Sequence, residues 1–311
     1  MSDRKLHVAV LMGGWSAERE VSLMSGKGVA DALESRGHTV TRIDMDRNVA
    51  AVIAETQPDV VFNALHGTPG EDGRVQGMLD LMQVSYTHSG MTTSVIAIDK
   101  QLTKNELLPH GIPMPEGRIV DSESLYSGDP FARPYVLKPV NEGSSVGVAI
   151  VREAGNYGNP IGRDVKGPWQ EFDQLLAEPF IKGRELTTAV VGGEPLMVTE
   201  LVTSSGFYDY DAKYTEGVTR HICPAEIPQD IAEYCKELAL KAHQILGCKG
   251  PSRSDFRWDD ELGRDGLFLL EVNTQPGMTP LSLVPEQAKA AGIDYAELVE
   301  RIVREALEQA P

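Results

Sequence analysis

The apolar positions of the first ninety residues alternate between short continuous runs and longer amphipathic stretches. The runs KLHVAVLM, HTVTRID and DVVFNAL predict strands, and the stretches from Ser16 to Arg36, NVAAVIAETQ and GRVQGMLDLM predict helices. Strands and helices in this order predict a parallel sheet with right-handed crossovers. Because ligands gather at the carboxyl ends of such strands, the segments GGWSAERE and HGTPGEDG form the predicted binding edge.

The middle of the chain mixes one helical pattern with several strand patterns. A single helix is predicted over SVIAIDKQLTKNELLPHG, and RPYVLKP and VAIV predict two strands joined by the turn NEGSSVG. Residues 153–170 hold Gly and Pro at a density that excludes a long helix, which predicts a loop or lid. The segment AEPFIKGRELTTAVVGG is strand-like, with EPLMVTELV as its hairpin partner.

The turn from Gly143 to Gly147 matches the GxSxG pattern of serine hydrolases. That nucleophile elbow requires a strand followed by a helix, whereas this turn is predicted to join two strands. The context therefore disfavours a hydrolase and favours a flexible hairpin whose amides cover a phosphate. Lys138 follows the apolar residues YVL just before this turn, a placement that suits a phosphate contact.

The last hundred residues contain a predicted antiparallel hairpin, in which SDFRW and LFLLEVN flank the turn DDELGRDG. A long polar loop at 203–224 and a helix from Pro228 to Leu246 precede the hairpin, and a helix from Tyr295 to Leu307 closes the chain. Glu271 and Asn273 lie two apart on the second strand, so both side chains are expected on one face.

Asp255, Glu271 and Asn273 form a set of hard oxygen donors suited to Mg²⁺ held jointly with substrate phosphates. A structural alternative stays open, in which Glu271 pairs with Arg253 or Arg257 and Asp255 caps a strand. Two N-terminal residues are equally ambiguous. Glu18 could serve a ligand or only complement a helix dipole begun by Ser16, and His66 could be a loop histidine held by a backbone carbonyl.

Composition excludes several classes of protein. The chain has 311 residues, 41% of them hydrophobic and 24% charged, which describes a globular protein of two or three domains. A formal net charge of -17 argues against a nucleic-acid partner. No apolar run approaches the ~18 residues of a membrane span, and the N-terminus lacks signal-peptide features. The three cysteines lack metal-ligand spacing and are expected to be reduced thiols of a cytoplasmic protein.

Seven motifs occur in one order along the chain: GGWSAEREVSLMSG, ALHGTPGEDGRVQG, DK at Asp99 and Lys100, LKP-x-x-EGSSVG, FIKGREL, YDYDAKY and LEVNTQPGMTPLSLVP. In these motifs, over almost its whole length, the chain resembles D-alanine–D-alanine ligases of the ATP-grasp superfamily. The resemblance implies three α/β domains, expected at 1–92, 93–178 and 179–311, with ATP held between the central and C-terminal ones. It also implies ATP and D-alanine as substrates, two Mg²⁺ ions that Mn²⁺ can replace, and a homodimer.

The implied reaction activates the carboxylate of one D-alanine as an acyl phosphate, which the amine of a second D-alanine attacks. The products are ADP, phosphate and the dipeptide used in peptidoglycan synthesis. Because a carboxylate is a poor electrophile, the catalyst must mainly position the reactants and neutralise anions.

The resemblance assigns a role to each matching position. On the nucleotide side it implies metal binding by Asp255, Glu271 and Asn273, phosphate contacts by Lys100, Lys138 and Ser145, and adenosine contacts by Glu178, Phe180, Ile181 and Glu185. On the amino-acid side it implies Glu18 and His66 for the first D-alanine and Ser282 and Leu283 for the carboxylate of the second. Ser144, Tyr214 and Glu18 would form a hydrogen-bonded chain, Lys213 would face substrate, and Arg253 and Gly277 would stabilise the oxyanion.

Two departures from the family pattern stand out. Pro179 replaces a lysine that the family places against adenine, and the Gly- and Pro-rich residues 153–170 replace a regular helix. Two other functional hypotheses stay open. A D-alanine–D-lactate or D-alanine–D-serine ligase of the same fold would differ in the tyrosine-bearing loop, and a catalytically silent nucleotide-binding regulator would lack the metal ligands that this chain retains.

Overall fold

The N-terminal sheet is parallel, as predicted. The computed structural model describes residues 4–143, 146–153, 157–203 and 219–308. In it β1 (His7–Met12) lies between β2 (Thr39–Asp44) and β3 (Val60–Asn63), and α1 (Arg19–Ser35), α2 (Val49–Thr56) and α3 (Arg74–Met82) follow the strands in turn. Helix α1 begins at Arg19, so the predicted start at Ser16 is wrong.

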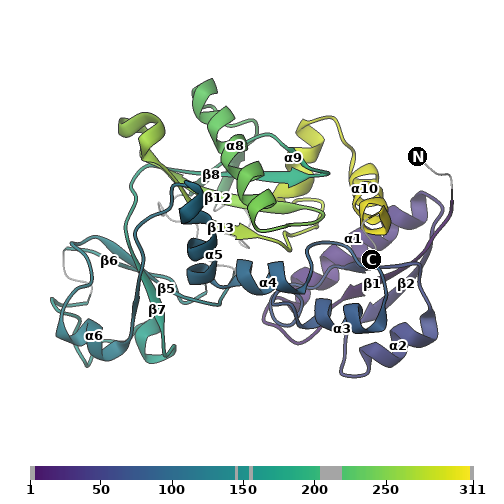
Figure 1. Ribbon diagram of the computed structural model, residues 1–311, viewed down its shortest axis with the longest axis horizontal. Helices are drawn as coiled ribbons and strands as arrows, with labels where there is room; N and C mark the ends of the chain where they lie inside the picture. Colours follow the sequence, from purple (N-terminus) through teal and green to yellow (C-terminus); the bar gives the residue numbers. More distant parts are fainter. Residues whose placement is uncertain (1–3, 144–145, 154–156, 204–218, 309–311) are drawn as a thin grey trace.

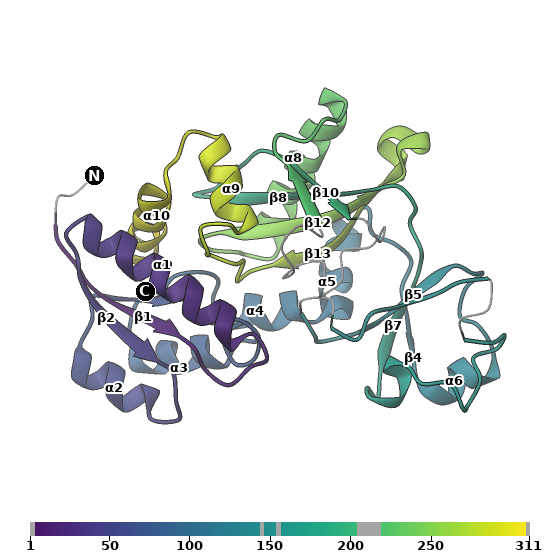
Figure 2. The same ribbon diagram turned by 180° about the vertical axis from the view of Figure 1, so that it is seen from behind.

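Helices cover both faces of this sheet because alternate residues of β1 point to opposite sides. Val8 and Val10 pack with residues of α1 and of the C-terminal helix α10 (Tyr295–Glu308). Ala9 and Leu11 pack with residues of α2 and α3. The end of the chain therefore returns to its beginning, and Figures 1 and 2 both show α10 beside α1.

The single helix predicted over 94–111 is instead two helices, α4 (Met91–Ile98) and α5 (Lys100–Leu107), followed by a 3-10 turn at Leu108–His110. Asp99 between them has an extended backbone, with φ −88° and ψ 107°. Its side chain accepts hydrogen bonds from the backbone N–H groups of Gln101 and Leu102, both at 2.9 Å. This N-cap starts a new helix axis, which the hydrophobic period alone did not reveal.

The central sheet is antiparallel, in the order β4 (Arg118–Val120), β7 (Leu175–Pro179), β5 (Tyr135–Pro139) and β6 (Ala149–Val151). β4 and the short α6 (Ser122–Ser127) were not predicted. β5 and β6 form the hairpin around 143–147, so the strand-to-strand context that argues against a hydrolase is confirmed. In the described part of 153–170, Ile161 and Trp169 are buried in the core of this region.

The C-terminal sheet has the order β11 (Thr219–Ile222), β10 (Thr199–Thr203), β8 (Arg184–Val191), β12 (Ser252–Trp258) and β13 (Leu267–Asn273), with β9 (Glu194–Pro195) beside β8. The segment predicted as one strand over 177–193 is two strands in different sheets, β7 and β8. Gly183 lies just before β8, where the chain passes from one sheet to the other. Its φ is +98°, and a Cβ there would stand 2.1 Å from the carbonyl oxygen of Trp258. β11 and the end of β10 occupy part of the predicted loop 203–224.

Among the described residues, helices lie on both faces of the C-terminal sheet. α8 (Gln229–Ile245) and the region around α5 bury one face, in a core that includes Leu186, Phe256 and Leu269. α9 (Leu283–Ala290) contacts β8 on the opposite face. Figure 1 shows the N-terminal and central sheets at opposite ends, with the C-terminal sheet between them. Within the described ranges, no helix is long and apolar enough to cross a membrane.

Candidate active site

Two adjoining pockets lie where the three sheets meet. One, of about 290 Å³, is lined from the N-terminal region and from the segment 271–283, and we call it the amino-acid pocket. The other, of about 80 Å³, lies between the central and C-terminal sheets, and we call it the slot. Lys100, Glu142 and Glu271 line both. A group bound in the slot can therefore face a group bound in the amino-acid pocket across these three residues.

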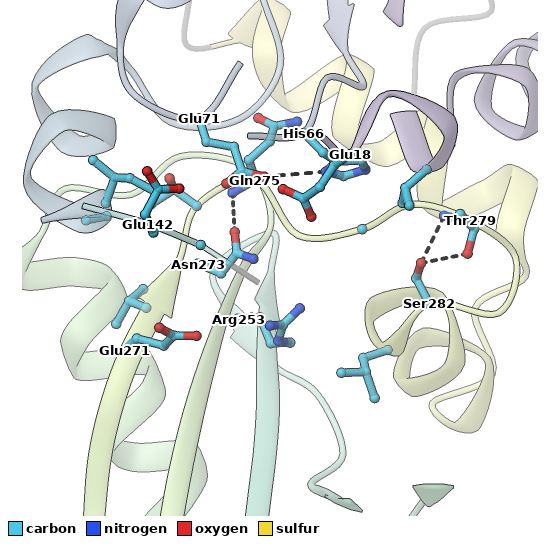
Figure 3. Close-up of a pocket in the computed structure, with 18 of the residues that line it drawn as sticks. Glu18, His66, Glu71, Glu142, Arg253, Glu271, Asn273, Gln275, Thr279 and Ser282 are labelled. Carbon is cyan, nitrogen blue, oxygen red and sulfur yellow. Dashed lines mark hydrogen bonds and ion pairs between the residues drawn. The ribbon is translucent and has the colours of Figure 1, made fainter. Parts of the chain in front are cut away.

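The hairpin of β12 and β13 forms the floor between the pockets, and its predicted geometry is confirmed. Asp255 lies directly opposite Glu271, and Arg253 lies opposite Asn273. Residues opposite each other in an antiparallel pair share a face, so all four side chains stand on one side of the sheet. Figure 3 shows Arg253, Glu271 and Asn273 projecting from the strands toward the pocket.

On this face of the sheet Asp255 has an ion-pair partner, whereas Glu271 has none among the described residues. Arg253 donates to both oxygens of Asp255 at 2.8 Å, and Thr187 donates to Asp255 Oδ1 at 2.6 Å. Arg257 instead pairs with Glu185, at 3.3 Å. Within the described ranges, Glu271 forms an ion pair with neither arginine. The structural alternative that paired Glu271 with Arg253 or Arg257 is therefore wrong.

The donor set fits a hard cation. A partly buried carboxylate such as Glu271 is costly without a counter-charge. Asn273 Oδ1 accepts a hydrogen bond from the N–H of Gln275 at 2.8 Å, which fixes the amide oxygen. In the described part of the chain no three His, Cys, Asp or Glu side chains group as a metal site by themselves. Two carboxylates and one amide suit Mg²⁺ that takes its remaining ligands from phosphate and water.

The slot has apolar walls and polar ends, as adenosine-binding clefts do. Val136 from β5, Phe180, Ile181 and Leu270 from β13 form its apolar lining. The N–H of Phe180 donates to Pro134 O at 3.2 Å, and the carbonyl of Ile181 accepts from Arg257 at 3.1 Å. Glu178, Pro179 and Glu185 also line the slot. All four residues predicted to contact adenosine are therefore at one cavity.

Two residues that line the slot, Glu178 and Lys138, form the buried ion cluster together with Lys104. Lys104 Nζ is 2.6 Å from Glu178 Oε1, and Lys138 Nζ pairs with Oε2 of the same carboxylate. The three residues are 1%, 2% and 8% exposed. Burial alone would raise the pKa of Glu178, but the charges of Lys138 and Lys104 together lower that pKa below its ordinary value. Glu178 is thus held as a carboxylate.

The N-terminal side of the amino-acid pocket places Glu18, His66 and Glu71 together (Figure 3). Among the residues that the structure describes, no backbone carbonyl binds the His66 ring. Its Nε2 lies 3.0 Å from Ser25 Oγ and its Nδ1 lies 3.5 Å from Glu71 Oε1. Glu18 occupies the N-cap position of α1, and Ser16 Oγ accepts from its N–H at 3.2 Å while donating to His66 O at 2.7 Å.

A pair of buried amides joins this side to the metal ligands. Gln275 Nε2 donates to the carbonyl of Asn63 at 2.6 Å, and Asn63 Nδ2 donates to Gln275 Oε1 at 3.2 Å. Asn63 Nδ2 also donates to Gly70 O at 2.9 Å. The segment that carries Asn273 is therefore fixed to the end of β3, where the N-terminal binding edge was predicted.

The opposite side of the pocket contains Gly277, Ser282 and Leu283. Ser282 precedes α9, and its hydroxyl lies 2.7 Å from that of Thr279, a contact visible in Figure 3. A Cβ at Gly277 would stand 2.9 Å from Ser282 Oγ, so glycine allows this turn to close. Ser282 and Leu283 at the start of α9 line the pocket, and the first N–H groups of a helix have no partner within it and favour an anion.

Four predicted site residues, Ser144, Ser145, Lys213 and Tyr214, lie outside the described residues. Four further residues in or beside the two pockets were not predicted: Glu71, Lys104, Glu142 and Gln275. Glu71, Glu142 and Gln275 lie within quoted motifs and could have been singled out from them. Lys104 lies four residues after Lys100 on α5, a spacing that puts both on one helix face.

Comparison with known proteins gives one consistent family. The family model described as the D-ala D-ala ligase C-terminus matches residues 127–304, and the model of the N-terminus matches residues 48–89. The D-alanine–D-alanine ligase of Sphingopyxis alaskensis is 77% identical over 307 residues, which cover 99% of this chain and 100% of the relative. That of Novosphingobium aromaticivorans is 74% identical over 310 residues, covering 100% and 99%.

Solved structures agree with the sequence relatives. The D-alanine–D-alanine ligase of Bacillus anthracis superposes with a TM-score of 0.80 at 30% identity, covering 97% of this chain and 98% of that one. The same enzyme complexed with ATP gives 0.79 at 27% identity, with the same coverage. The ATP-grasp architecture predicted from the motifs is thus confirmed. Because the family model for the C-terminus spans more than half of the chain and curated relatives match it from end to end, the chain belongs to the D-alanine–D-alanine ligase family.

Proposed function

We propose that this protein joins two D-alanine molecules into D-alanyl-D-alanine at the expense of ATP, through an acyl phosphate, for peptidoglycan synthesis. The observation that carries the proposal is the meeting of the slot and the amino-acid pocket at Lys100, Glu142 and Glu271. A nucleotide in the slot would present its terminal phosphate at that junction. A carboxylate in the amino-acid pocket would meet it there. Phosphoryl transfer needs the two anions held together, with the attacking and leaving oxygens roughly in line about the phosphorus.

The nucleotide side holds adenosine and neutralises phosphate. Adenine would lie between the apolar walls of the slot, with Glu178, Phe180 and Ile181 at its edge and Glu185 toward the ribose hydroxyls. Lys100 and Lys138 line the slot and would contact phosphate oxygens. Asp255, Glu271 and Asn273 would hold two Mg²⁺ ions, which Mn²⁺ could replace. Either metal, when bound, would neutralise negative charge on the terminal phosphates.

The amino-acid side orients two substrates for successive attacks. Glu18 would bind the ammonium of the first D-alanine, with His66 near its carboxylate, so that a carboxylate oxygen attacks the terminal phosphorus and ADP leaves. The amine of the second D-alanine would then attack the acyl carbon and expel phosphate. Ser282 and the start of α9 at Leu283 would hold its carboxylate. Arg253 and the N–H of Gly277 would stabilise the tetrahedral oxyanion.

A second candidate shares the first half-reaction but takes D-lactate or D-serine as the nucleophile. The residues that would discriminate, Lys213 and Tyr214, lie in the loop outside the described residues. The YDYDAKY motif itself favours the dipeptide-forming branch. A catalytically silent regulator is disfavoured, since Arg253 and all three oxygen donors are present on one face of the hairpin. Because ATP is a substrate, we place the reaction in the cytoplasm, and the homodimer stays a prediction.

A substrate screen tests the proposal. Purified protein with MgATP is offered D-alanine, D-lactate, D-serine and the three L-forms, alone and in pairs with D-alanine, and ADP release is followed with product identification. We expect ADP release that depends on D-alanine, with D-alanyl-D-alanine as the main product. Absence of D-alanine-dependent ADP release contradicts a ligase that takes D-alanine as its first substrate. A lactate ester as the main product at neutral pH would instead replace D-alanine by D-lactate as the second substrate.

A further inference from the structure

One buried cation near the slot has no part in the reaction described above. Lys104 on α5 is 1% exposed and lines neither pocket. Its Nζ is 2.6 Å from Glu178 Oε1 and donates to the carbonyl oxygen of Pro115 at 2.7 Å. Burial lowers the pKa of Lys104, while the nearby Glu178 carboxylate acts in the opposite direction. A buried lysine is retained at a cost, which invites a functional explanation.

The partner of Lys104 is also the partner of a phosphate-side lysine. Lys138 pairs with the other oxygen of Glu178, and within the described ranges it forms no other ion pair. Lys138 lines the slot, whereas Lys104 stands on the far side of the carboxylate. One carboxylate is thus shared by two ammonium groups. The cluster carries a net positive charge, and only Lys138 is placed to present that charge to a ligand in the slot.

We propose that Lys104 is a positioning residue which, by sharing the charge of Glu178, leaves Lys138 available to the phosphates of the nucleotide. The inference rests on the proposed function only in taking a nucleotide as the ligand of the slot. Without Lys104, the whole negative charge of a buried Glu178 would act on Lys138. In a medium of low dielectric constant that attraction is strong, so Lys138 would be held against Glu178 and largely neutralised.

The placement of α5 gives the proposal a structural basis. Lys100 and Lys104 are one helical turn apart, and both reach toward the central sheet. Lys100 Nζ donates to the carbonyl of Glu142 at 2.5 Å, at the junction of the two pockets. Asp99 caps this helix and so sets the position of both lysines. Helix α5 therefore places Lys100 at the junction of the two pockets and places Lys104 where it shares the charge of Glu178 with Lys138.

Binding measurements separate this role from simple packing. Calorimetry in EDTA would compare ADP with adenosine, which lacks phosphates, for wild type, Lys104→Met, Glu178→Gln and the double variant. We expect Lys104→Met to weaken ADP binding about tenfold, since contacting charged groups couple by roughly 1.4 kcal/mol. Adenosine binding should change by less than about twofold on the same scale. In the Glu178→Gln background the same methionine substitution should have little effect on ADP.

Several outcomes would overturn the inference. Equal loss of ADP and adenosine affinity in Lys104→Met, or an equal loss with and without Glu178, would assign Lys104 to packing alone. Lys104→Arg keeps the charge and should keep ADP affinity, and it replaces Lys104→Met as the test if the latter does not fold in a thermal melt. Failure of that rescue counts against the proposal. Wild-type ADP binding without any ligase activity would contradict the proposed function and leave this inference standing.

Discussion

Two groups of charged side chains border the slot, and they balance their charges differently. In the buried ion cluster of Lys104, Glu178 and Lys138, the single carboxylate has a lysine on each oxygen, and its side chain is 3% exposed. On the hairpin, Asp255 is paired with Arg253, but Glu271 has no ion-pair partner within the described ranges. The cluster is complete without a ligand, whereas the hairpin has an excess of negative charge that a cation can satisfy.

The difference indicates which changes should affect folding and which should affect turnover. A buried charge whose partner is removed destabilises the folded state, because the remaining charge is left without compensation. Neutralising a carboxylate that has no ion-pair partner leaves no other charge uncompensated, so the folded state is not destabilised in this way. Substitutions at Glu178 and Glu271 should therefore separate stability from chemistry.

The largest expected effect is on turnover, in Glu271→Gln. The amide keeps the size of the side chain but removes the negative charge that would hold Mg²⁺, so we expect ADP formation to fall by about a thousandfold, roughly 4 kcal/mol of transition-state stabilisation. The thermal unfolding midpoint should stay at or above that of wild type. Steady-state kinetics over a range of Mg²⁺ and a thermal melt check both statements. Turnover like that of wild type would return Glu271 to a structural role.

The next effect is on stability, in Glu178→Gln. Two buried lysines would lose their shared counter-charge, and we expect the free energy of unfolding at pH 7 to fall by about 3 kcal/mol. Urea unfolding measures this change. Glu123→Gln is the matched control, because Glu123 is an exposed glutamate of the same region whose ion pair with Arg163 lies in solvent. Its unfolding midpoint should match wild type. A Glu178→Gln midpoint equal to that control would contradict the comparison.

The two groups also differ in how far the sequence predicted them. Asp255, Glu271 and Asn273 were placed on one face by the period of two within a hairpin, and the register bears this out. Nothing local marks Lys104 as buried, since its neighbours in KQLTKNEL are mostly polar. Its burial depends on Glu178, 74 residues later, and on α5 lying against the C-terminal sheet. Pairings over such separations do not appear in a local pattern.

Errors in the predicted elements have the same origin. The two helices on either side of Asp99 were predicted as one helix, and the two strands on either side of Gly183 as one strand. In both places the chain turns because of a local backbone feature, a side-chain cap at Asp99 and a positive φ at Gly183. These turns decide the site, because one sets α5 beside Glu178 and the other carries the chain from the central sheet to the C-terminal sheet.

The smallest expected effect is the pH dependence that the buried ion cluster gives to stability. The pKa of Glu178 is lowered in the folded protein from an ordinary value of 4.5, so the folded state binds fewer protons than the unfolded state in the acid range. Stability from this group is therefore fully present above about pH 4.5 and is lost as the pH falls through the folded-state pKa. Glutamine does not titrate.

The stability difference between wild type and Glu178→Gln should consequently be constant from pH 7 to pH 5 and shrink below pH 4.5. Urea unfolding midpoints of both proteins at half-unit pH steps measure that difference, and other carboxylates common to both cancel from it. A difference that is unchanged down to the lowest pH at which both proteins fold would mean that the lysines do not stabilise the Glu178 carboxylate, and the contrast between the two charged groups would not hold.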